Sequence, residues 1–239
     1  MSKAKIIFFS GAGISAESGI STFRAVDGLW ENHNIEDVCS EQTWQTNFEL
    51  VHKFYNQRRV QLGTVKPNEA HKMVSRVQKK YSSDTIIITQ NVDNLFERAG
   101  CRGVLHVHGE LTKMDCQSCG YIWEIGYNEF KPNKDFCPKC ASNFVKPYIV
   151  FFGGAAPKYE DMALAFDEAD NENSIIVVIG TMGNVIAIEN ILLYSEAKKV
   201  LNNLESSVYI HDGMFNEVYY EEATKASLKI EKYIEENFM

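Results

Sequence analysis

The sequence has no surplus of basic residues. Among its 239 residues, 24 lysines and arginines stand against 32 aspartates and glutamates, and the formal net charge at pH 7 is −8. Proteins that bind phosphate backbones concentrate positive charge, whereas the basic residues here are scattered along the chain. We therefore expect no nucleic-acid partner. The acidic balance suits a basic protein substrate, although ordinary solubility explains it as well.

A long apolar segment is lacking near the N-terminus. The first apolar run covers residues 6–9, and Ser10 and Gly11 end it. Four residues are too few for a signal peptide or a membrane span. We expect a cytoplasmic monomer with no membrane partner.

Cysteine is scarce, yet four of the six cysteines form a pattern. Two C-x-x-C pairs are separated by 17 residues, and they consist of Cys116, Cys119, Cys137 and Cys140. This spacing is typical of a four-thiolate zinc site, and four thiolates leave no open position for catalysis. Two disulfides or redox pairs are the alternative, which a cytoplasmic setting disfavours. The sequence therefore predicts one structural Zn²⁺ ion.

Apolar, β-branched runs that alternate with helical patterns predict an α/β protein with a mostly parallel sheet. The expected strands are residues 5–9, 85–89, 104–108 and 174–179, with shorter ones near 148–152 and 200–204. Helical spacing marks two helices through Ala70, Met73, Val74 and Val77 after a capping Asn68, and through Ile230, Tyr233 and Ile234.

Two segments interrupt this alternation. Residues 31–83 look helical without a strand, and residues 113–145 hold the four cysteines. Both are expected to be insertions that form a smaller lobe of one domain, residues 1–239, whose core comprises residues 1–30, 84–112 and 146–239. A chain of this length with 45% hydrophobic residues can bury one sizeable core. The cleft between core and lobe is the expected ligand site.

The turn after the first strand reads G-A-G-I-S-A-E-S-G-I, residues 11–20. Gly11, Gly13 and Ala16 satisfy the dinucleotide fingerprint G-x-G-x-x-[G/A], at a place where a pyrophosphate can rest. Packing alone also requires small residues in many loops, so three glycines are a weak signal. The following residues 19–28 look like a loop instead of the helix and second strand of a dehydrogenase. The pattern favours a nucleotide site over an ordinary oxidoreductase.

Three further clusters follow the ends of expected strands. Residues 90–94 read Q-N-V-D-N, residues 104–108 place His106 and His108 on one face, and Gly180 and Thr181 follow residues 174–179. Carboxyl ends of parallel strands share one edge of a sheet, where ligands bind. Each cluster also has a structural alternative. Residues 90–94 could form a turn that caps a helix, and either histidine could be a hydrogen-bonded core residue. Gly180 could simply belong to a turn. His108, beside Gly109, is the preferred general base, and Gly109 and Glu110 are expected to end the strand.

Taken together, these residues resemble the sirtuins, the NAD-dependent protein lysine deacylases. The resemblance rests on G-A-G-I-S-A-E-S-G-I-x-T-F-R at residues 11–24, Q-N-V-D at 90–93, H-G-E from His108, the cysteine quartet and G-T at 180–181. It implies a Rossmann-type domain with a small zinc-bearing lobe. It also implies that NAD is consumed, so that acylated lysine yields free lysine, nicotinamide and O-acyl-ADP-ribose. The alternative is an NAD-dependent mono-ADP-ribosyltransferase on the same fold.

The resemblance assigns roles to individual residues. His108 would accept a proton from the ribose, and Asp93 would hold the nicotinamide amide. The NAD-binding set would be Gly11, Ala12, Gly13, Ser15, Glu17, Thr22, Phe23, Arg24, Trp30, Gln90, Asn91, Val92, Asp93, Gly180, Thr181, Met182, Asn203, Leu204, Glu205 and Ala223. The acylated protein substrate would contact Tyr55, Arg58, Val150, Phe151, Phe152 and Gly153.

Tyr55 and Arg58 form a Y-x-x-R pattern that, within the sirtuins, marks the class resembling bacterial desuccinylases and demalonylases. Three residues apart on a helix, they would point the same way and bind a carboxylate on the acyl chain. Without the family, an ordinary surface helix would explain them. Several positions depart from the family's pattern: Cys39 stands where alanine is usual, Gly154 where glutamate is usual, Met182 where serine is usual, and Ala187-Ile188 where Pro-Ala is usual.

Overall fold

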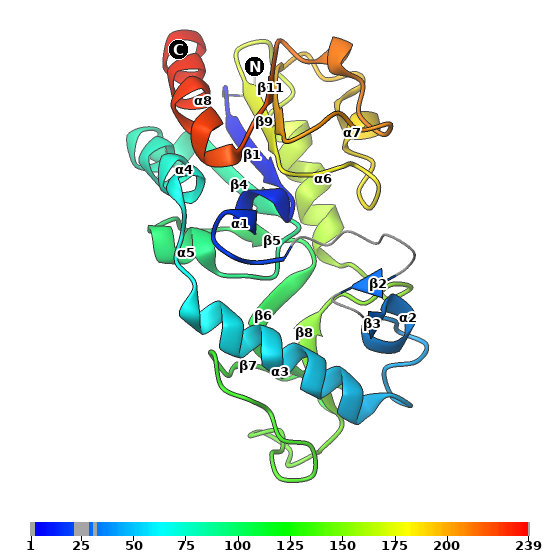
Figure 1. Cartoon of the computed structure of the whole chain (residues 1–239). Coiled ribbons are helices and arrows are strands. Elements are labelled where there is room, and N and C mark those ends of the chain that lie inside the picture. Colours follow the sequence, from blue (N-terminus) through cyan, green and yellow to red (C-terminus); the bar gives the residue numbers. More distant parts are fainter. Residues whose placement is uncertain (1–2, 22–28, 31–32, 239) are drawn as a thin grey trace.

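The computed structural model describes residues 3–21, 29–30 and 33–238. Figure 1 shows two lobes, with the larger one above and the smaller one, crossed by the long helix α3, below. Within the described ranges, none of the helices combines the length and the apolar character that crossing a membrane requires.

The large lobe is built on a six-stranded sheet in which every neighbouring pair is parallel. The order is β11-β10-β9-β1-β4-β5, so the first strand of the chain lies inside the sheet. The strands are β1 (Ile6–Ser10), β4 (Thr85–Thr89), β5 (Leu105–His106), β9 (Ile175–Ile179), β10 (Lys198–Asn203) and β11 (Glu217–Tyr220). The predicted α/β class with a mostly parallel sheet is confirmed.

Helices cover both faces of this sheet, as the alternation of side chains along β1 requires. Ile6 and Phe8 pack with α4 (Glu69–Lys80) and α8 (Ala223–Asn237). On the opposite face, Ile7 and Phe9 share a core with α6 (Lys158–Glu168) and α7 (Ile188–Leu192). The shorter helical elements are α1 (Gly13–Ala16), η1 (Ser82–Asp84), α5 (Leu95–Ala99) and η2 (Asp212–Met214).

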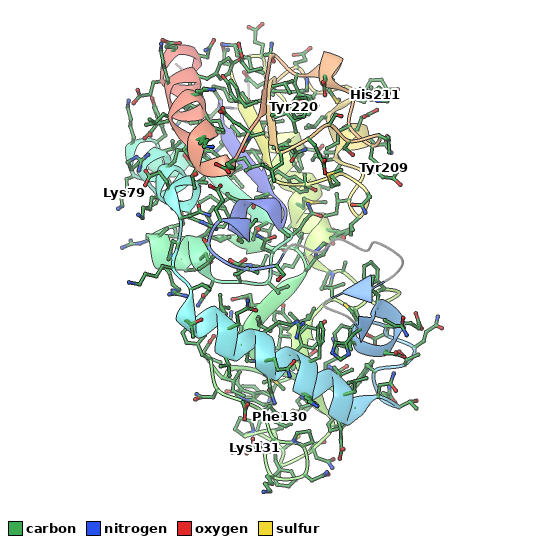
Figure 2. The ribbon with its side chains drawn as sticks, in the orientation of Figure 1. Lys79, Phe130, Lys131, Tyr209, His211 and Tyr220 are labelled. Atoms are coloured by element: carbon green, nitrogen blue, oxygen red, sulfur yellow. The ribbon has the colours of Figure 1, made fainter. Side chains whose placement is uncertain are left out.

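The small lobe combines helices with a three-stranded antiparallel sheet of order β7-β6-β8. Its elements are β2 (Leu29–Trp30), β3 (His33–Asn34), α2 (Ile35–Val38), α3 (Phe48–Thr64), β6 (Gly109–Cys116), β7 (Ile122–Glu124) and β8 (Val145–Ile149). The buried amide of Asn56 on α3 bonds both the backbone N–H and the carbonyl of Phe130, which Figure 2 labels at the lower end of the molecule. This pair fastens the long connection between β7 and β8 to the helix.

Helix α4 packs differently from its predicted place. It lies within residues 31–83, which the sequence assigned to the small lobe, yet Ala70, Met73, Val74 and Val77 are buried in the core of the large sheet. The predicted cap is confirmed, because the Asn68 side chain accepts hydrogen bonds from the N–H groups of residues 70 and 71. The helix has a pronounced apolar face, and this face packs on the six-stranded sheet, which offers the larger apolar surface.

The segment around the two histidines also differs. β5 ends at His106, and Gly109 with Glu110 begins the next strand, β6, instead of ending the previous one. Gly109 has φ +89°, and a Cβ there would lie 2.1 Å from the carbonyl oxygen of Tyr148 on β8. The glycine therefore lets β6 start against β8, and His108 lies where the chain crosses from the large sheet to the small one.

Other strands shift by a few residues or were missed. The strand expected near 148–152 is β8 at Val145–Ile149, and it joins the small sheet. The strand expected at 200–204 is β10 at Lys198–Asn203. The strands that were not predicted are β2, β3, β6, β7 and β11, and none of them carries an apolar run long enough to signal a strand.

Candidate active site

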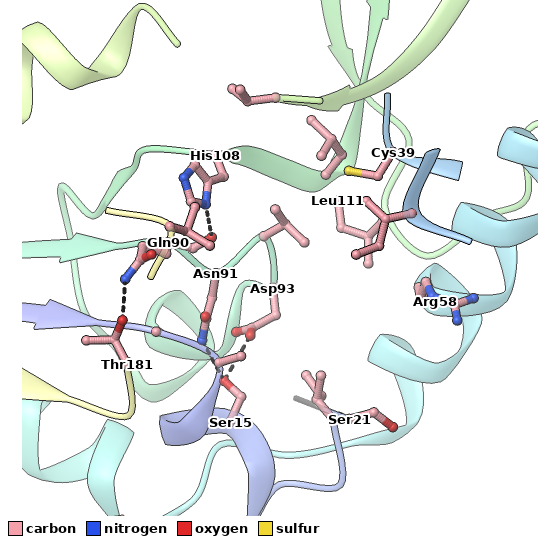
Figure 3. A pocket seen from close by; sticks show the side chains of 18 of the residues that line it. Ser15, Ser21, Cys39, Arg58, Gln90, Asn91, Asp93, His108, Leu111 and Thr181 are labelled. Carbon is pink, nitrogen blue, oxygen red and sulfur yellow. Dashed lines mark hydrogen bonds between the residues drawn. The ribbon is translucent and has the colours of Figure 1, made fainter. Parts of the chain in front are cut away.

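A cavity of about 1260 Å³ lies between the two lobes, and the carboxyl ends of β1, β4, β5 and β9 meet at it. Figure 3 labels polar side chains of the large lobe around it, including Ser15, Gln90 and His108, and shows Arg58 on α3 at the side of the small lobe. The predicted residues that line it are Gly11, Ala12, Gly13, Ser15, Tyr55, Arg58, Gln90, Asn91, Val92, Asp93, His108, Val150, Phe151, Phe152, Gly153, Gly180, Thr181, Met182, Asn203, Leu204 and Glu205.

Close backbone contact between two loops forms one side of this cavity. The N–H of Gly13 donates to the carbonyl oxygen of Gly180 at 2.9 Å, and a Cβ on Gly13 would lie 2.6 Å from the Cα of Gly180. Gly180 itself has φ +65°, where side chains are disfavoured. These glycines allow the turns after β1 and β9 to touch.

The turn after β9 is tied to its neighbours by side-chain amides. The Gln90 amide donates to the Thr181 hydroxyl at 3.0 Å (Figure 3). The Asn203 side chain accepts from the Thr181 N–H at 3.0 Å and donates to its carbonyl at 2.9 Å. Gly180, Thr181 and Asn203, three members of the predicted NAD-binding set, are thus held together by hydrogen bonds.

A buried polar cluster lies beneath the turn after β4. The Ser15 hydroxyl donates to the Asp93 carboxylate at 2.9 Å and accepts from the Asn91 amide at 3.1 Å (Figure 3). The other Asp93 oxygen accepts from the N–H of Leu95 at 3.0 Å. Burial raises the pKa of Asp93. Asp93 therefore both accepts a hydrogen bond from the first residue of α5 and lines the cavity.

His106 and His108, of which the sequence favours His108 as the general base, occupy different environments. His106 is buried, with its Nδ1 2.8 Å from the Asn91 carbonyl and its Nε2 3.0 Å from the Glu97 carboxylate. Burial alone would lower the pKa of His106, but the hydrogen bond and charge of Glu97 help to raise it. Both ring nitrogens face acceptors, an arrangement that favours the protonated form of His106.

His108 lines the cavity, and its Nδ1 lies 3.1 Å from the carbonyl oxygen of Gln90 (Figure 3). A carbonyl only accepts, so Nδ1 carries the proton and Nε2 of the neutral ring is an acceptor. Burial lowers the pKa of His108, which favours this neutral form at pH 7. A neutral imidazole with a fixed tautomer is suited to act as a general base.

The small lobe contributes an apolar end of the cavity around Tyr55. Tyr55 is buried on α3, its ring lies 5.8 Å from that of Phe151, and Cys39 lines the same region. Arg58, one turn along α3, donates from Nη1 to the Phe54 carbonyl at 2.8 Å, and its guanidinium carbon lies 3.3 Å from the Phe54 ring centroid. Tyr55 and Arg58 therefore line one cavity wall.

Two buried cations surround this apolar end. Arg59 donates to the Leu111 carbonyl at 2.8 Å and to the Asn56 side-chain oxygen, acceptors that carry no formal charge. Lys146 donates to the Ile149 carbonyl at 2.8 Å, and its Nζ lies 4.6 Å from the Phe151 ring centroid. Burial lowers the pKa values of both Arg59 and Lys146. Together with Arg58 they place positive charge at this end of the cavity, while the carboxylates of Glu36 and Asp37 also belong to residues of its lining.

The four predicted zinc ligands converge in the small lobe. The Sγ atoms of Cys116, Cys119, Cys137 and Cys140 lie within 4.8 Å of one another, and these cysteines are free. The Cys116–Cys140 and Cys119–Cys137 sulfur separations are 3.6 and 3.8 Å. Zn–S bonds of about 2.3 Å in a tetrahedron place sulfurs about 3.8 Å apart. The four residues fit a zinc ion, and none of them forms a disulfide in this structure.

The comparisons with known proteins agree with this architecture. The sequence profile of the Sir2 family matches residues 11–187. The chain belongs to the Sir2 family. A relative named NAD-dependent protein deacylase from Helicobacter hepaticus is 42% identical over 255 residues, covering 98% of this chain and 99% of its own. A relative of the same name from Campylobacter jejuni is 40% identical over 234 residues, covering 98% and 97%.

Solved structures share the Sir2 fold over almost the whole chain. A Sir2 homologue in complex with NAD superposes with a TM-score of 0.83 at 29% identity, covering 97% of this chain and 90% of its own. A mutant Sir2 homologue in complex with ADP-ribose gives a TM-score of 0.84 at 29% identity, covering 97% and 92%. The expected Rossmann-type fold and the family resemblance are thereby confirmed.

Some predicted residues do not line the cavity, and some lining residues were not predicted. Glu17 instead accepts hydrogen bonds from the N–H and hydroxyl of Thr224, at the start of α8, where Ala223 also lies. Thr22, Phe23 and Arg24 and the side chain of Trp30 fall outside the described residues. Sequence reasoning missed Tyr159, which carries no motif and reaches the site from α6.

Proposed function

We propose that this chain is an NAD-dependent protein lysine deacylase, with His108 as its general base. The observation that carries the proposal is the environment of His108: the Gln90 carbonyl fixes the Nδ1–H tautomer, and Nε2 is directed as an acceptor at a cavity of about 1260 Å³. The names of the Helicobacter and Campylobacter relatives and the NAD complex of a structural neighbour support this function.

In this proposal the large lobe binds NAD along the edge of its sheet. Gly13 and Gly180 let the backbone approach the pyrophosphate, Thr181 and Asn203 hold the adenosine side, and Asp93 receives the nicotinamide amide. When bound, NAD supplies a nicotinamide–ribose bond whose cleavage leaves a carbon that the acyl oxygen can attack. His108 then accepts a proton from a ribose hydroxyl at Nε2.

The acyl group would occupy the apolar end of the cavity. Tyr55 and Arg58 line it, and Arg59 and Lys146 add positive charge behind it. We propose that this end accepts a carboxylate on the acyl chain, so that succinyl and malonyl lysine are substrates beside acetyl lysine. Cys39 narrows the same region in place of a smaller alanine, and shorter acidic chains are therefore expected to fit better than longer ones.

The zinc ion would hold the connection between β6 and β8 in place and take no part in the reaction. Cys116 ends β6, and Val145 of β8 shares a small apolar cluster with it. Four thiolates complete the tetrahedron, so the chemistry supplied by the metal is structural.

The test combines purified protein, NAD and lysine peptides that are acetylated or succinylated. Mass spectrometry should detect O-acyl-ADP-ribose and the free-lysine peptide, and His108→Tyr should abolish both products while leaving the melting temperature close to that of the parent. Labelling of protein by NAD with no consumption of acylated peptide would instead support an ADP-ribosyltransferase. Full turnover by His108→Tyr would remove His108 from the mechanism.

A further inference from the structure

The acceptor atom of His108 is engaged by Tyr159, on the first turn of α6. The Tyr159 hydroxyl lies 2.8 Å from His108 Nε2, and the two ring centroids are 5.9 Å apart. Both side chains line the cavity between the lobes. The N–H of Tyr159 bonds the Ala156 carbonyl at 3.0 Å, which fixes the backbone position from which the ring reaches His108.

The direction of this hydrogen bond follows from the other side of the imidazole. The Gln90 carbonyl accepts from Nδ1–H at 3.1 Å, so Nε2 of the neutral ring has a lone pair and no proton. The phenol must therefore donate to Nε2. Burial raises the pKa of Tyr159, so the hydroxyl keeps its proton throughout the neutral pH range.

The neighbouring charged groups already have other partners. Asp93, on the β4–α5 connection, accepts from Ser15, and Glu110 on β6 pairs with Lys113 at 2.8 Å. On α6, Lys158 pairs with Asp161 at 3.3 Å. Tyr159 is thus the side chain that holds the working nitrogen of His108 in this structure.

We propose that Tyr159 is a positioning residue that occupies His108 Nε2 until the nicotinamide-side ribose of NAD replaces it. The proposal rests on His108 being the general base of the proposed deacylase. A ribose hydroxyl can donate to Nε2 only after the phenol has moved away, because one lone pair accepts one strong hydrogen bond. Tyr159 therefore keeps the ring oriented in the free protein and competes with the ribose for the same atom.

If Tyr159 competes with the ribose, removing its hydroxyl should raise the affinity for the ligand instead of lowering it. Tyr159→Phe removes the competing donor and keeps the ring, so ADP-ribose, which carries that ribose, should bind about two- to tenfold more tightly, the change expected for one net neutral hydrogen bond. ADP lacks the second ribose and should bind both proteins equally. A merely structural role for Tyr159 would weaken ADP-ribose binding or affect both ligands alike.

The experiment is isothermal titration calorimetry of the full chain with ADP-ribose and with ADP. It compares the parent, Tyr159→Phe, His108→Ala and the double variant, and Tyr194→Phe serves as a control because Tyr194 is 87% exposed. Tyr159→Phe should have no effect when His108 is already alanine, since the two side chains act through one bond.

Several results would overturn the proposal: unchanged or weaker ADP-ribose binding by Tyr159→Phe, an equal gain for ADP, or a gain that persists without His108. In turnover assays the KM for NAD should fall in Tyr159→Phe while kcat does not rise. If no acylated peptide is consumed by the parent, the proposed deacylase function fails, but the binding comparison still decides whether Tyr159 and the ribose compete for His108.

Discussion

Replacing Arg58 by methionine should separate acidic from neutral acyl substrates. The substitution keeps an unbranched apolar stem on α3 and removes the guanidinium, which lines the cavity and donates one hydrogen bond to the Phe54 carbonyl. Acetyl lysine has no carboxylate, so its binding does not use the guanidinium fork. Under the proposed function, the terminal carboxylate of succinyl lysine binds at the apolar end that Arg58 and Tyr55 line.

The expected size of the effect follows from the kind of bond lost. A hydrogen bond to a charged group contributes about 1.5–3 kcal/mol, which corresponds to a loss of about 10- to 150-fold in kcat/KM for the succinylated peptide. Arg59 and Lys146 remain and keep the region positive, which places the expected loss toward the lower end of that range. The acetylated peptide should change by less than about threefold, because no charged pair is broken.

The assay measures kcat/KM for matched acetylated and succinylated peptides by mass spectrometry, for the parent and three variants. Arg58→Lys keeps the charge without the two-pronged geometry and should lie between the parent and Arg58→Met. Arg102→Met, at an exposed arginine outside the cavity, controls for loss of surface charge. Equal losses on both peptides, with unchanged melting temperatures, would refute the carboxylate argument and leave Arg58 as a structural residue.

Three further predictions concern the framework of the site. Gly180→Ala should weaken ADP-ribose binding more than tenfold by calorimetry, because its Cβ would lie 2.4 Å from the backbone nitrogen of Ile14 and Gly180 has φ +65°. The control Gly213→Ala, whose Cβ would have no atom within 4 Å, should bind ADP-ribose as the parent does. Tight binding by Gly180→Ala would contradict this prediction. A chelator should release one zinc ion per chain, measured with a metallochromic dye, and lower the melting temperature, while a metal-free chain of full stability would argue against a structural role. His106 has a raised pKa, so its contribution to folding is present at low pH and is lost as pH rises through that pKa. The difference in free energy of unfolding between the parent and His106→Gln, measured in urea, should therefore be larger at pH 6 than at pH 9. An equal difference at both pH values would show that His106 is not charged.

Local features of the chain were predictable because they depend on neighbouring residues. Buried strands such as Ile6–Ser10 consist of apolar, β-branched or aromatic residues, the Asn68 cap lies directly before its helix, and the cysteine spacing defines the zinc ligands. A dinucleotide-type turn after the first strand is equally local. These features needed no knowledge of what packs against them.

Contacts between distant segments were not predictable from the same patterns. His106 differs from His108 because its ring bonds the Glu97 carboxylate. His108 lies where the chain leaves the large sheet, just before Gly109, whose backbone packs closely against the carbonyl of Tyr148 on β8. The sequence pattern of α4 indicates a helix but does not indicate which lobe the helix packs on. Tyr159 and His108 are 51 residues apart in the sequence, and no local pattern links them. Each of these outcomes is decided by tertiary packing, which overrides local preference.

The glycine fingerprint illustrates how the packing and ligand-binding explanations of one motif combine. A Cβ on Gly13 would meet the backbone of Gly180, so the small residue is required by contact between two loops of the protein itself. That contact brings the turn after β9 alongside the turn after β1, and the Gln90 amide, directly after β4, then donates to the Thr181 hydroxyl at 3.0 Å. The carboxyl ends of β1, β4 and β9 thereby form one wall of the cavity. The glycines are needed for packing, and because this packing shapes the cavity, it also shapes the proposed nucleotide site.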